Sequence, residues 1–114
     1  MMIEKIILDY LNDVLTPPVW MGIPKGEHIP AEYVLLEKTG SSVENYIHYA
    51  SFAIQSYADS MYAAATLNEA VKEAMDEIIT LDSIGKSKLN SDYNFTDTET
   101  KKYRYQAVYD ITHY

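Results

Sequence analysis

The sequence contains no cysteine among its 114 residues, which excludes disulfide bonds, thiolate metal sites and a cysteine nucleophile. It has only four glycines and four prolines, and no long run of Pro, Ser, Gly or one charge suggests a disordered arm, so we expect the chain to fold throughout. No apolar run approaches the roughly 20 residues of a membrane-spanning helix, and residues 2–15 lack the basic start of a secretory signal. Because apolar residues still make up 47 % of the chain, we expect one globular domain over residues 1–114.

Basic residues are also scarce, because nine Lys and Arg face 17 Asp and Glu and give a net charge of −8. Residues 1–57 hold 3 basic and 7 acidic side chains, and residues 58–114 hold 6 and 10, so neither half is a basic lobe. Nucleic-acid binding depends mainly on Lys and Arg that neutralise phosphates. The composition therefore argues against a protein that grips DNA or RNA, although DNA could pass beside it without specific binding.

Catalytic and metal-binding patterns are missing. The histidines, His28, His48 and His113, show no metal-ligand spacing, and no Gly-x-Ser-x-Gly elbow is present. We therefore predict no catalytic residue, no metal site, no cofactor and no enzymatic activity. One alternative stays open, a small ligand-binding or enzymatic α+β domain with a pocket near Tyr46, His48 and Tyr109.

Two segments have the 3.6-residue apolar period of amphipathic helices. The first runs over residues 2–15 and ends before Pro17. The second begins at an N-cap residue, Asp59 or Ser60, and continues to about Thr80. Asn68 is expected on its polar face. The residues expected on its buried face are Met61, Ala64, Leu67, Val71, Ala74 or Met75, and Ile78.

Five segments have the composition or the alternation of β-strands. A short loop or hairpin turn is expected at Thr39–Ser42, and a longer exposed loop at Asp97–Lys102. The resulting order α-β-β-β-α-β-β predicts an α+β fold, with a mainly antiparallel sheet of four to five strands and two amphipathic helices. The predicted strands are Val19–Met21, Tyr33–Lys38, Asn45–Tyr57, Leu89–Thr96 and Tyr103–Thr112.

Tyrosines are concentrated near the C-terminus, which raises the possibility of a base-stacking surface. The residues between them include Asp92, Asp97 and Asp110, whereas such surfaces normally line a positively charged groove. We expect instead one buried or interface-facing side of a hairpin. The residues that share its parity are Leu89, Tyr93, Phe95, Tyr103, Tyr105, Ala107, Tyr109 and Ile111.

Several sequence blocks resemble the tail terminator or tail completion proteins of long-tailed bacteriophages and of prophages of Gram-positive bacteria. The resemblance covers most of the chain from about Val19 onward and keeps the order of the blocks. The blocks are Tyr33–Gly40, Ala53–Ala58, Leu67–Lys72, Leu89–Asp97 and Tyr103–Asp110.

The resemblance implies a structural α+β subunit of the virion that forms a ring, commonly a hexamer, at the head-proximal end of the tail. Such a ring caps the tail tube and joins it to the head connector, so the tail tube protein and the connector protein are expected partners. We expect the subunit interfaces to use sheet edges and two polar segments. The expected interface residues are Thr39, Gly40, Ser41, Ser42 and Val43, with Asp97, Thr98, Glu99, Thr100, Lys101 and Lys102.

Overall fold

The computed structural model describes residues 2–23, 29–100 and 102–114. These residues form two α-helices, one short 3₁₀ helix and five β-strands. The predicted order of helices and strands, and with it the α+β class, is confirmed. In chain order the elements are α1 (Ile3–Val14), β1 (Val19–Trp20), β2 (Tyr33–Glu44), β3 (Ile47–Ala58), α2 (Met61–Glu77), η1 (Ile78–Thr80), β4 (Ile84–Asn94) and β5 (Tyr103–His113).

The strands form one sheet in the order β1-β2-β3-β5-β4. Every neighbouring pair is antiparallel except β1 and β2, which run parallel over Val19–Trp20. The prediction of a mainly antiparallel sheet is therefore confirmed. Since β1 is so short, β2 and β4 form most of the two sheet edges.

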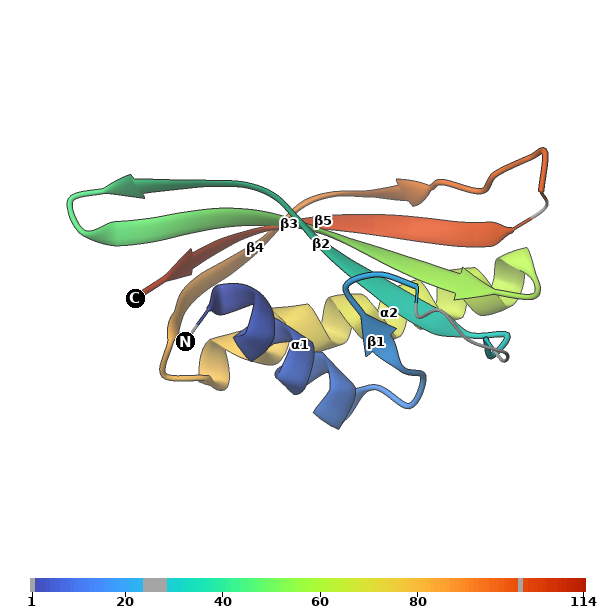
Figure 1. Cartoon of the computed structure of the whole chain (residues 1–114), viewed down its shortest axis with the longest axis horizontal. Helices are drawn as coiled ribbons and strands as arrows, with labels where there is room; N and C mark the ends of the chain where they lie inside the picture. Colours follow the sequence, from blue (N-terminus) through green and yellow to red (C-terminus); the bar gives the residue numbers. More distant parts are fainter. Residues whose placement is uncertain (1, 24–28, 101) are drawn as a thin grey trace.

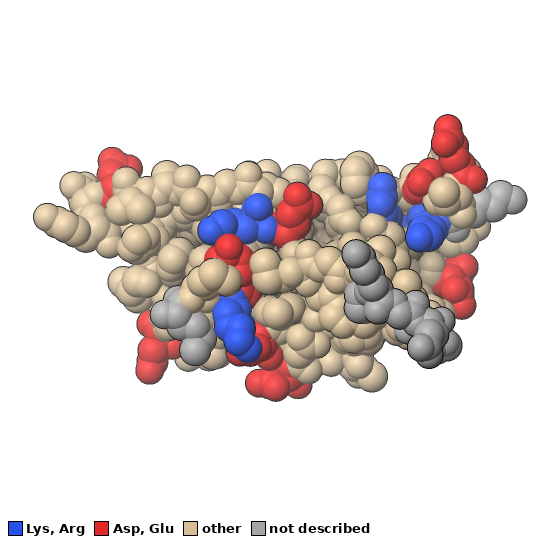
Figure 2. Space-filling view, in the orientation of Figure 1, with Lys and Arg blue, Asp and Glu red and all other residues tan. Residues whose placement is uncertain are grey.

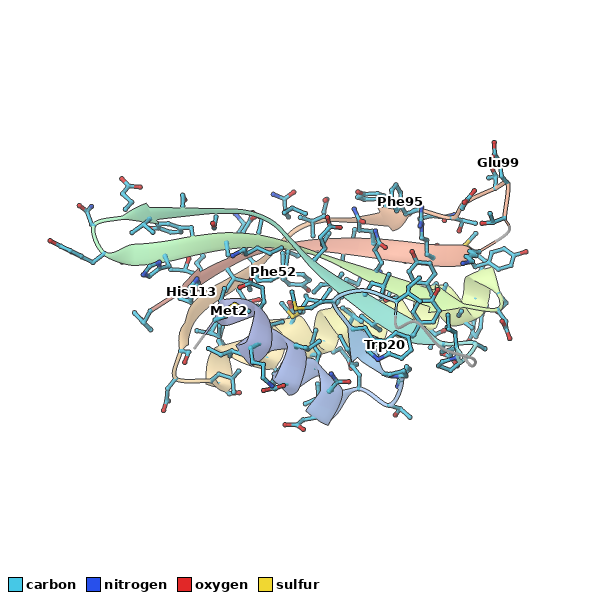
Figure 3. All side chains as sticks on the ribbon, in the orientation of Figure 1. Met2, Trp20, Phe52, Phe95, Glu99 and His113 are labelled. Carbon is cyan, nitrogen blue, oxygen red and sulfur yellow. The ribbon has the colours of Figure 1, made fainter. Side chains whose placement is uncertain are left out.

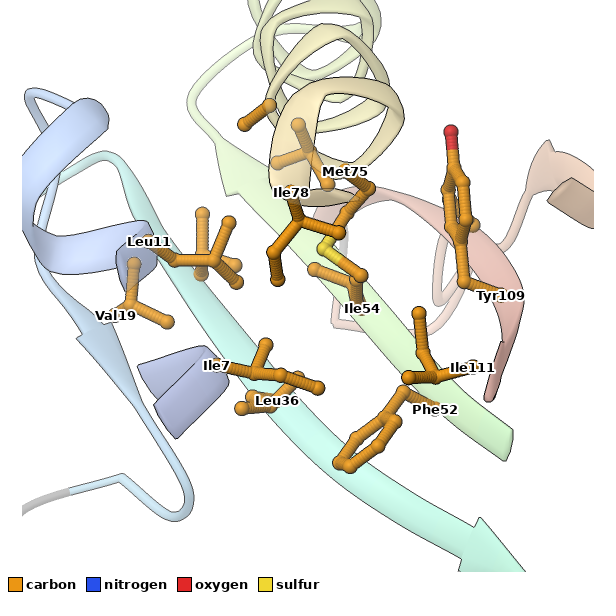
Figure 4. Close-up of a cluster of buried hydrophobic side chains, with 14 of the residues drawn as sticks. Ile7, Leu11, Val19, Leu36, Phe52, Ile54, Met75, Ile78, Tyr109 and Ile111 are labelled. Atoms are coloured by element: carbon orange, nitrogen blue, oxygen red, sulfur yellow. The ribbon is translucent and has the colours of Figure 1, made fainter. Parts of the chain in front are cut away.

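Both α-helices lie on the same side of the sheet (Figure 1). We call this side the helix face and the other the open face. Phe52 and Ile54 of β3, with Tyr109 and Ile111 of β5, point from the helix face toward Met75 at the end of α2 (Figure 4). All five side chains are fully buried, so the main core lies between the sheet and its helices.

Helix α1 packs on the sheet through a stripe of residues spaced four apart. Ile3, Ile7 and Leu11 are buried because this spacing brings them onto one side of an α-helix. The Asn12 side chain then accepts a hydrogen bond from the Val19 backbone N–H (3.0 Å) and donates one to its carbonyl oxygen (3.0 Å). This exchange fixes β1 beside the end of α1.

Helix α2 begins at Ser60, whose side chain accepts a hydrogen bond from the Ala63 N–H (3.1 Å). This confirms one of the two predicted N-caps. The prediction that Asn68 lies on the polar face is wrong, since it is only 1 % exposed. Its amide donates to Asp92 Oδ1 (2.8 Å), and the Lys72 ammonium binds Asp92 Oδ2 (2.9 Å), so a polar contact with β4 extends the buried face of the helix.

The turn predicted at Thr39–Ser42 is also wrong, because this segment belongs to β2. The hairpin turn lies at Asn45 and Tyr46, which both have positive φ, 51° and 67°. A two-residue turn of this kind suits the twist of the flanking strands. Glycine and serine suggested a turn, but a bulge between Lys38 and Gly40 absorbs one extra residue and lets the pairing with β3 continue.

The predicted single side of the C-terminal hairpin is wrong for a related reason. Leu89 pairs with Tyr109, but a bulge before Ser91 adds one residue to β4. One extra residue moves every following side chain to the other face of the sheet. Tyr93 therefore pairs with Gln106 and lies on the open face, whereas Tyr109 lies on the helix face.

The packing of α1 yields a matched test. We expect Leu11→Ala to lower the free energy of unfolding by about 2–5 kcal/mol, because it empties a fully buried site. Val14→Ala in the same helix should change it by about 0.5 kcal/mol or less, since Val14 is 51 % exposed. Urea unfolding of both variants measures the two values, and equal losses would contradict the assigned buried face of α1.

Candidate functional site

The hairpin formed by β2 and β3 continues beyond the layer of helices (Figure 1). We call the segment Thr39–Ser51 the arm; it comprises the end of β2, the turn and the start of β3. Tyr46 at its tip is 97 % exposed and Val43 is 62 % exposed. In Figure 2 this end of the molecule shows mostly uncharged atoms. The arm therefore presents apolar side chains to solvent.

The predicted interface residues Thr39, Gly40, Ser41, Ser42 and Val43 all lie in the arm, on an edge strand and not in a turn. Thr39 occupies the bulge, where its hydroxyl donates to the Ser51 carbonyl oxygen (3.2 Å). The structure thus places this set at an exposed sheet edge, whose outer backbone has no partner strand within the described ranges.

A shallow pocket of about 330 Å³ lies on the open face where the arm joins β5. The Ser51 hydroxyl donates to Asp110 Oδ1 (2.9 Å), and the Asn90 amide donates to Asp110 Oδ2 (3.1 Å). Both oxygens of this carboxylate are thereby satisfied within the chain, and we call this pocket the trough. Its lining residues are Gly40, Ser41, Ser42, Tyr49, Ala50, Ser51, Asp110, Ile111 and Thr112.

The second predicted interface set lies at the opposite end of the molecule, whose longest extent is 44 Å (Figures 1 and 3). Asp97 organises this loop, since its Oδ1 accepts from the Glu99 N–H (3.0 Å) and the Thr100 N–H (3.4 Å). Hydrogen bonds from Thr100 and from the Glu99 backbone lower the pKa of Asp97. Thr98, Glu99, Thr100 and Lys102 are exposed, and Lys101 lies outside the described residues.

The structure does not gather Tyr46, His48 and Tyr109 around one cavity. Tyr46 lies at the tip of the arm, whereas Tyr109 is fully buried under α2, where its hydroxyl donates to Asp76 Oδ1 (3.0 Å). Burial and the Asp76 carboxylate raise the pKa of Tyr109. His48 stacks on His113 across two strands, with ring centroids 5.2 Å apart. None of the three residues lines the trough.

The part of the chain that the structure describes has no cluster of three or more His, Cys, Asp or Glu side chains able to hold a metal ion. None of its helices is long and apolar enough to cross a membrane. His28 lies outside the described residues.

A band of aromatic side chains crosses the open face at the end remote from the arm, and the sequence reasoning missed it. Tyr33 and Tyr57 stack with centroids 4.6 Å apart, and Trp20 lies 5.6 Å from Tyr33. The Arg104 guanidinium lies 4.4 Å from the Phe95 ring centroid and donates to the Tyr57 hydroxyl (2.9 Å). The β4 bulge brings Phe95 to this face, so the band depends on a register that the sequence pattern did not reveal.

None of the protein-family models scanned matches this chain, and a search of curated proteins finds no match either.

The turn at the tip of the arm is testable through its backbone. Tyr46 makes the turn with φ 67°, a region that costs an ordinary L-residue roughly 1–2 kcal/mol but costs glycine little. We expect Tyr46→Gly to raise the free energy of unfolding by up to about 1 kcal/mol, and Tyr46→Val to lower it by about 1 kcal/mol. Chemical denaturation measures both, and a destabilised Tyr46→Gly would show that the exposed ring stabilises the monomer.

The histidine pair predicts a pH dependence. Burial is the main cause that lowers the pKa of His113, and the charges of His48 and Lys38 lower it further, whereas a hydrogen bond with the Tyr114 backbone and the Glu4 carboxylate oppose this shift. The unfolded chain then binds more protons than the folded one near pH 6.5, so stability should fall as pH falls through this range. We expect the Tm to drop between pH 7.5 and 5.5, and His113→Gln to flatten that drop. An unchanged slope in His113→Gln would contradict this assignment.

Proposed function

We propose that the chain is a structural subunit of the phage tail terminator type. Copies assemble into a ring, hexameric by resemblance, that caps the head-proximal end of the tail tube and joins it to the head connector. The ring contacts the tail tube protein and the connector protein and resides in the virion, after synthesis in the cytoplasm of the bacterial host. DNA passes it without specific binding.

The observation that carries this proposal is the arm. The arm extends beyond the helices, so the apolar side chains of Val43 and Tyr46 are exposed to water. Exposed apolar area of this kind is typical of contact surfaces. Tyr46 also adopts a backbone conformation that disfavours its side-chain type, which suggests that the exposed ring is retained for a contact.

The placement of the expected interface segments supports a ring as well. The arm and the described residues of the second segment, 97–100 and 102, lie at opposite ends of the long axis, and the two long sheet edges lie on opposite sides. Neighbours that meet through two different surfaces form a heterologous contact, which closes into a ring when the rotation permits. The net charge of −8 suits a subunit around a passage for DNA, because it weakly repels the phosphates.

The proposal is tested with polymerising tail tube protein from the same phage or prophage genome. We expect tubes to stop lengthening when the protein is added and to end in a ring, as measured from tube lengths in electron micrographs. A Tyr46→Ser, Ile47→Ser double variant should lose capping because it removes apolar groups at the arm tip.

The matched control is Tyr62→Ser, which removes an exposed tyrosine from the first turn of α2 and leaves the arm tip unchanged. This variant should cap tubes normally. Tubes that lengthen without limit beside the wild-type protein would overturn the proposed function.

A further inference from the structure

Two long stretches of strand have no partner on their outer side among the described residues. On β2, β1 pairs only with Val34 and Leu35, so the outer edge is unpaired over residues 36–44. On the other side of the sheet β4 is the last strand, and its outer edge is unpaired over Ile84–Asn94. Unpaired N–H and C=O groups in a row are a template for a further strand.

The two edges carry opposite charges on the open face. On β2 the charged side chains that reach this face are Glu37 and Glu44, which pair across from Ala53 and Ile47. On β4 they are Lys86 and Lys88, which pair across from Thr112 and Asp110. All four are exposed, and none has an ion-pair partner within the described part of the chain.

The helix face of the same edges carries exposed apolar side chains. Val43 on β2 pairs with His48, and Leu89 on β4 pairs with Tyr109, so both belong to this face. Val43 is 62 % exposed and Leu89 is 38 % exposed. Each edge therefore carries one exposed apolar side chain on the helix face and charged side chains on the open face.

A single register matches both features. In antiparallel strands one step forward on one strand is one step backward on the other. If Val43 of one copy lies opposite Leu89 of another, Glu44 lies opposite Lys88. The apolar pair then shares the helix face and the charged pair shares the open face.

The geometry points to a direct strand-to-strand contact between copies of this chain. The outer edge of β2 at Ser42–Glu44 pairs antiparallel with the outer edge of β4 at Lys88–Asn90 of the next copy, with Val43 opposite Leu89 and Glu44 opposite Lys88. The inference rests on the proposed ring, and it specifies the residues that join its neighbours.

The direction of the strands agrees with this contact. Three successive antiparallel pairings separate β2 from β4 within one copy, so these strands run in opposite directions. Rotation about a ring axis that follows the strands preserves their direction, so β2 of one copy meets β4 of the next antiparallel. The sheets of successive copies then continue one another, and closure of the ring removes every free long edge.

Pairing of like edges is disfavoured by charge. Two β2 edges would bring only carboxylates together on the open face, and two β4 edges only lysines. Like charges directly opposite each other destabilise strand pairs. The occupant of each edge is therefore the opposite edge of a second copy, which gives a head-to-tail assembly and not a two-fold dimer.

Disulfide cross-linking tests the register. Because the chain contains no natural cysteine, only the introduced cysteines can form disulfides. Val43→Cys and Leu89→Cys are introduced together, and the assembled protein is oxidised and run on a non-reducing gel. Within one copy three strand spacings, about 14 Å, separate β2 from β4, too far for a disulfide. We expect a ladder of covalent oligomers that ends at the closed ring, and each single variant should stay monomeric on the gel.

The control pair, Val43→Cys with Tyr62→Cys on the exposed side of α2, should give no ladder. Assembly seen by native mass spectrometry without a ladder from the Val43–Leu89 pair would overturn the inference and leave the proposed function standing. Cross-linked dimers from Val43→Cys alone would overturn it too, because they require two β2 edges.

A ladder of covalent oligomers in a protein that fails to cap tubes would overturn the proposed function and support the strand-to-strand contact. No association at any concentration, alone or with tubes, would overturn both.

A charge exchange tests the ionic part of the contact. Glu44→Lys and Lys88→Glu should each weaken association about tenfold per interface, since attraction becomes repulsion, and the two changes in one chain should restore it. Glu73→Lys on the exposed side of α2 changes the net charge by the same amount and sign as Glu44→Lys and should have no such effect. Failure of the double exchange to recover association would rule out the Glu44–Lys88 register.

Discussion

The packing of two helices against one face of the sheet is the constraint on which the rest of the molecule depends. Helix α2 has 17 residues and is about 26 Å long, whereas β3 has 12 residues and extends about 40 Å. The helices therefore cover only part of the strands that they stabilise. The remainder forms the arm, which has hydrogen-bonded backbone but no second layer among the residues that the structure describes. The exposed apolar residues of the arm follow from this mismatch in length.

The described residues place no helix on the open face, and the side chains at its two ends are arranged differently. At one end, Trp20, Tyr33, Tyr57, Arg104 and Phe95 pack on one another, so side chains of the sheet itself shield its aromatic surface. At the arm end the open face carries small residues and a shallow trough. The first end also holds a pocket of about 300 Å³ beside Tyr33 and Tyr57, whereas the second end exposes the apolar side chains of the arm tip. This asymmetry supports a contact at the arm and at the edge that continues from it.

The sequence predicted the elements and their order because helix and strand periodicities are local properties of the chain. Ser60, the apolar stripe of α2 and the alternation along β5 were sufficient for that. The bulges at Thr39 and Asn90 were not predictable in this way, since one extra residue becomes visible only against a partner strand. The first bulge lets the strand continue through Thr39–Ser42, where glycine and serine suggest a turn, and the second moves Tyr93 to the face opposite the predicted one. The predicted interface residues Thr39–Val43 lie in an edge strand and not in the predicted loop.

The central claim is that the outer edges of β2 and β4 are unpaired in one copy and pair with each other between copies. Hydrogen–deuterium exchange of backbone amides, followed by mass spectrometry before and after assembly on tail tubes, tests it most directly. The account predicts that the outward-pointing amides in Ser42–Glu44 and Lys88–Asn90 exchange fast in the free protein and become protected together in the assembled one. Exchange rates at both edges that stay the same on assembly would contradict the claim.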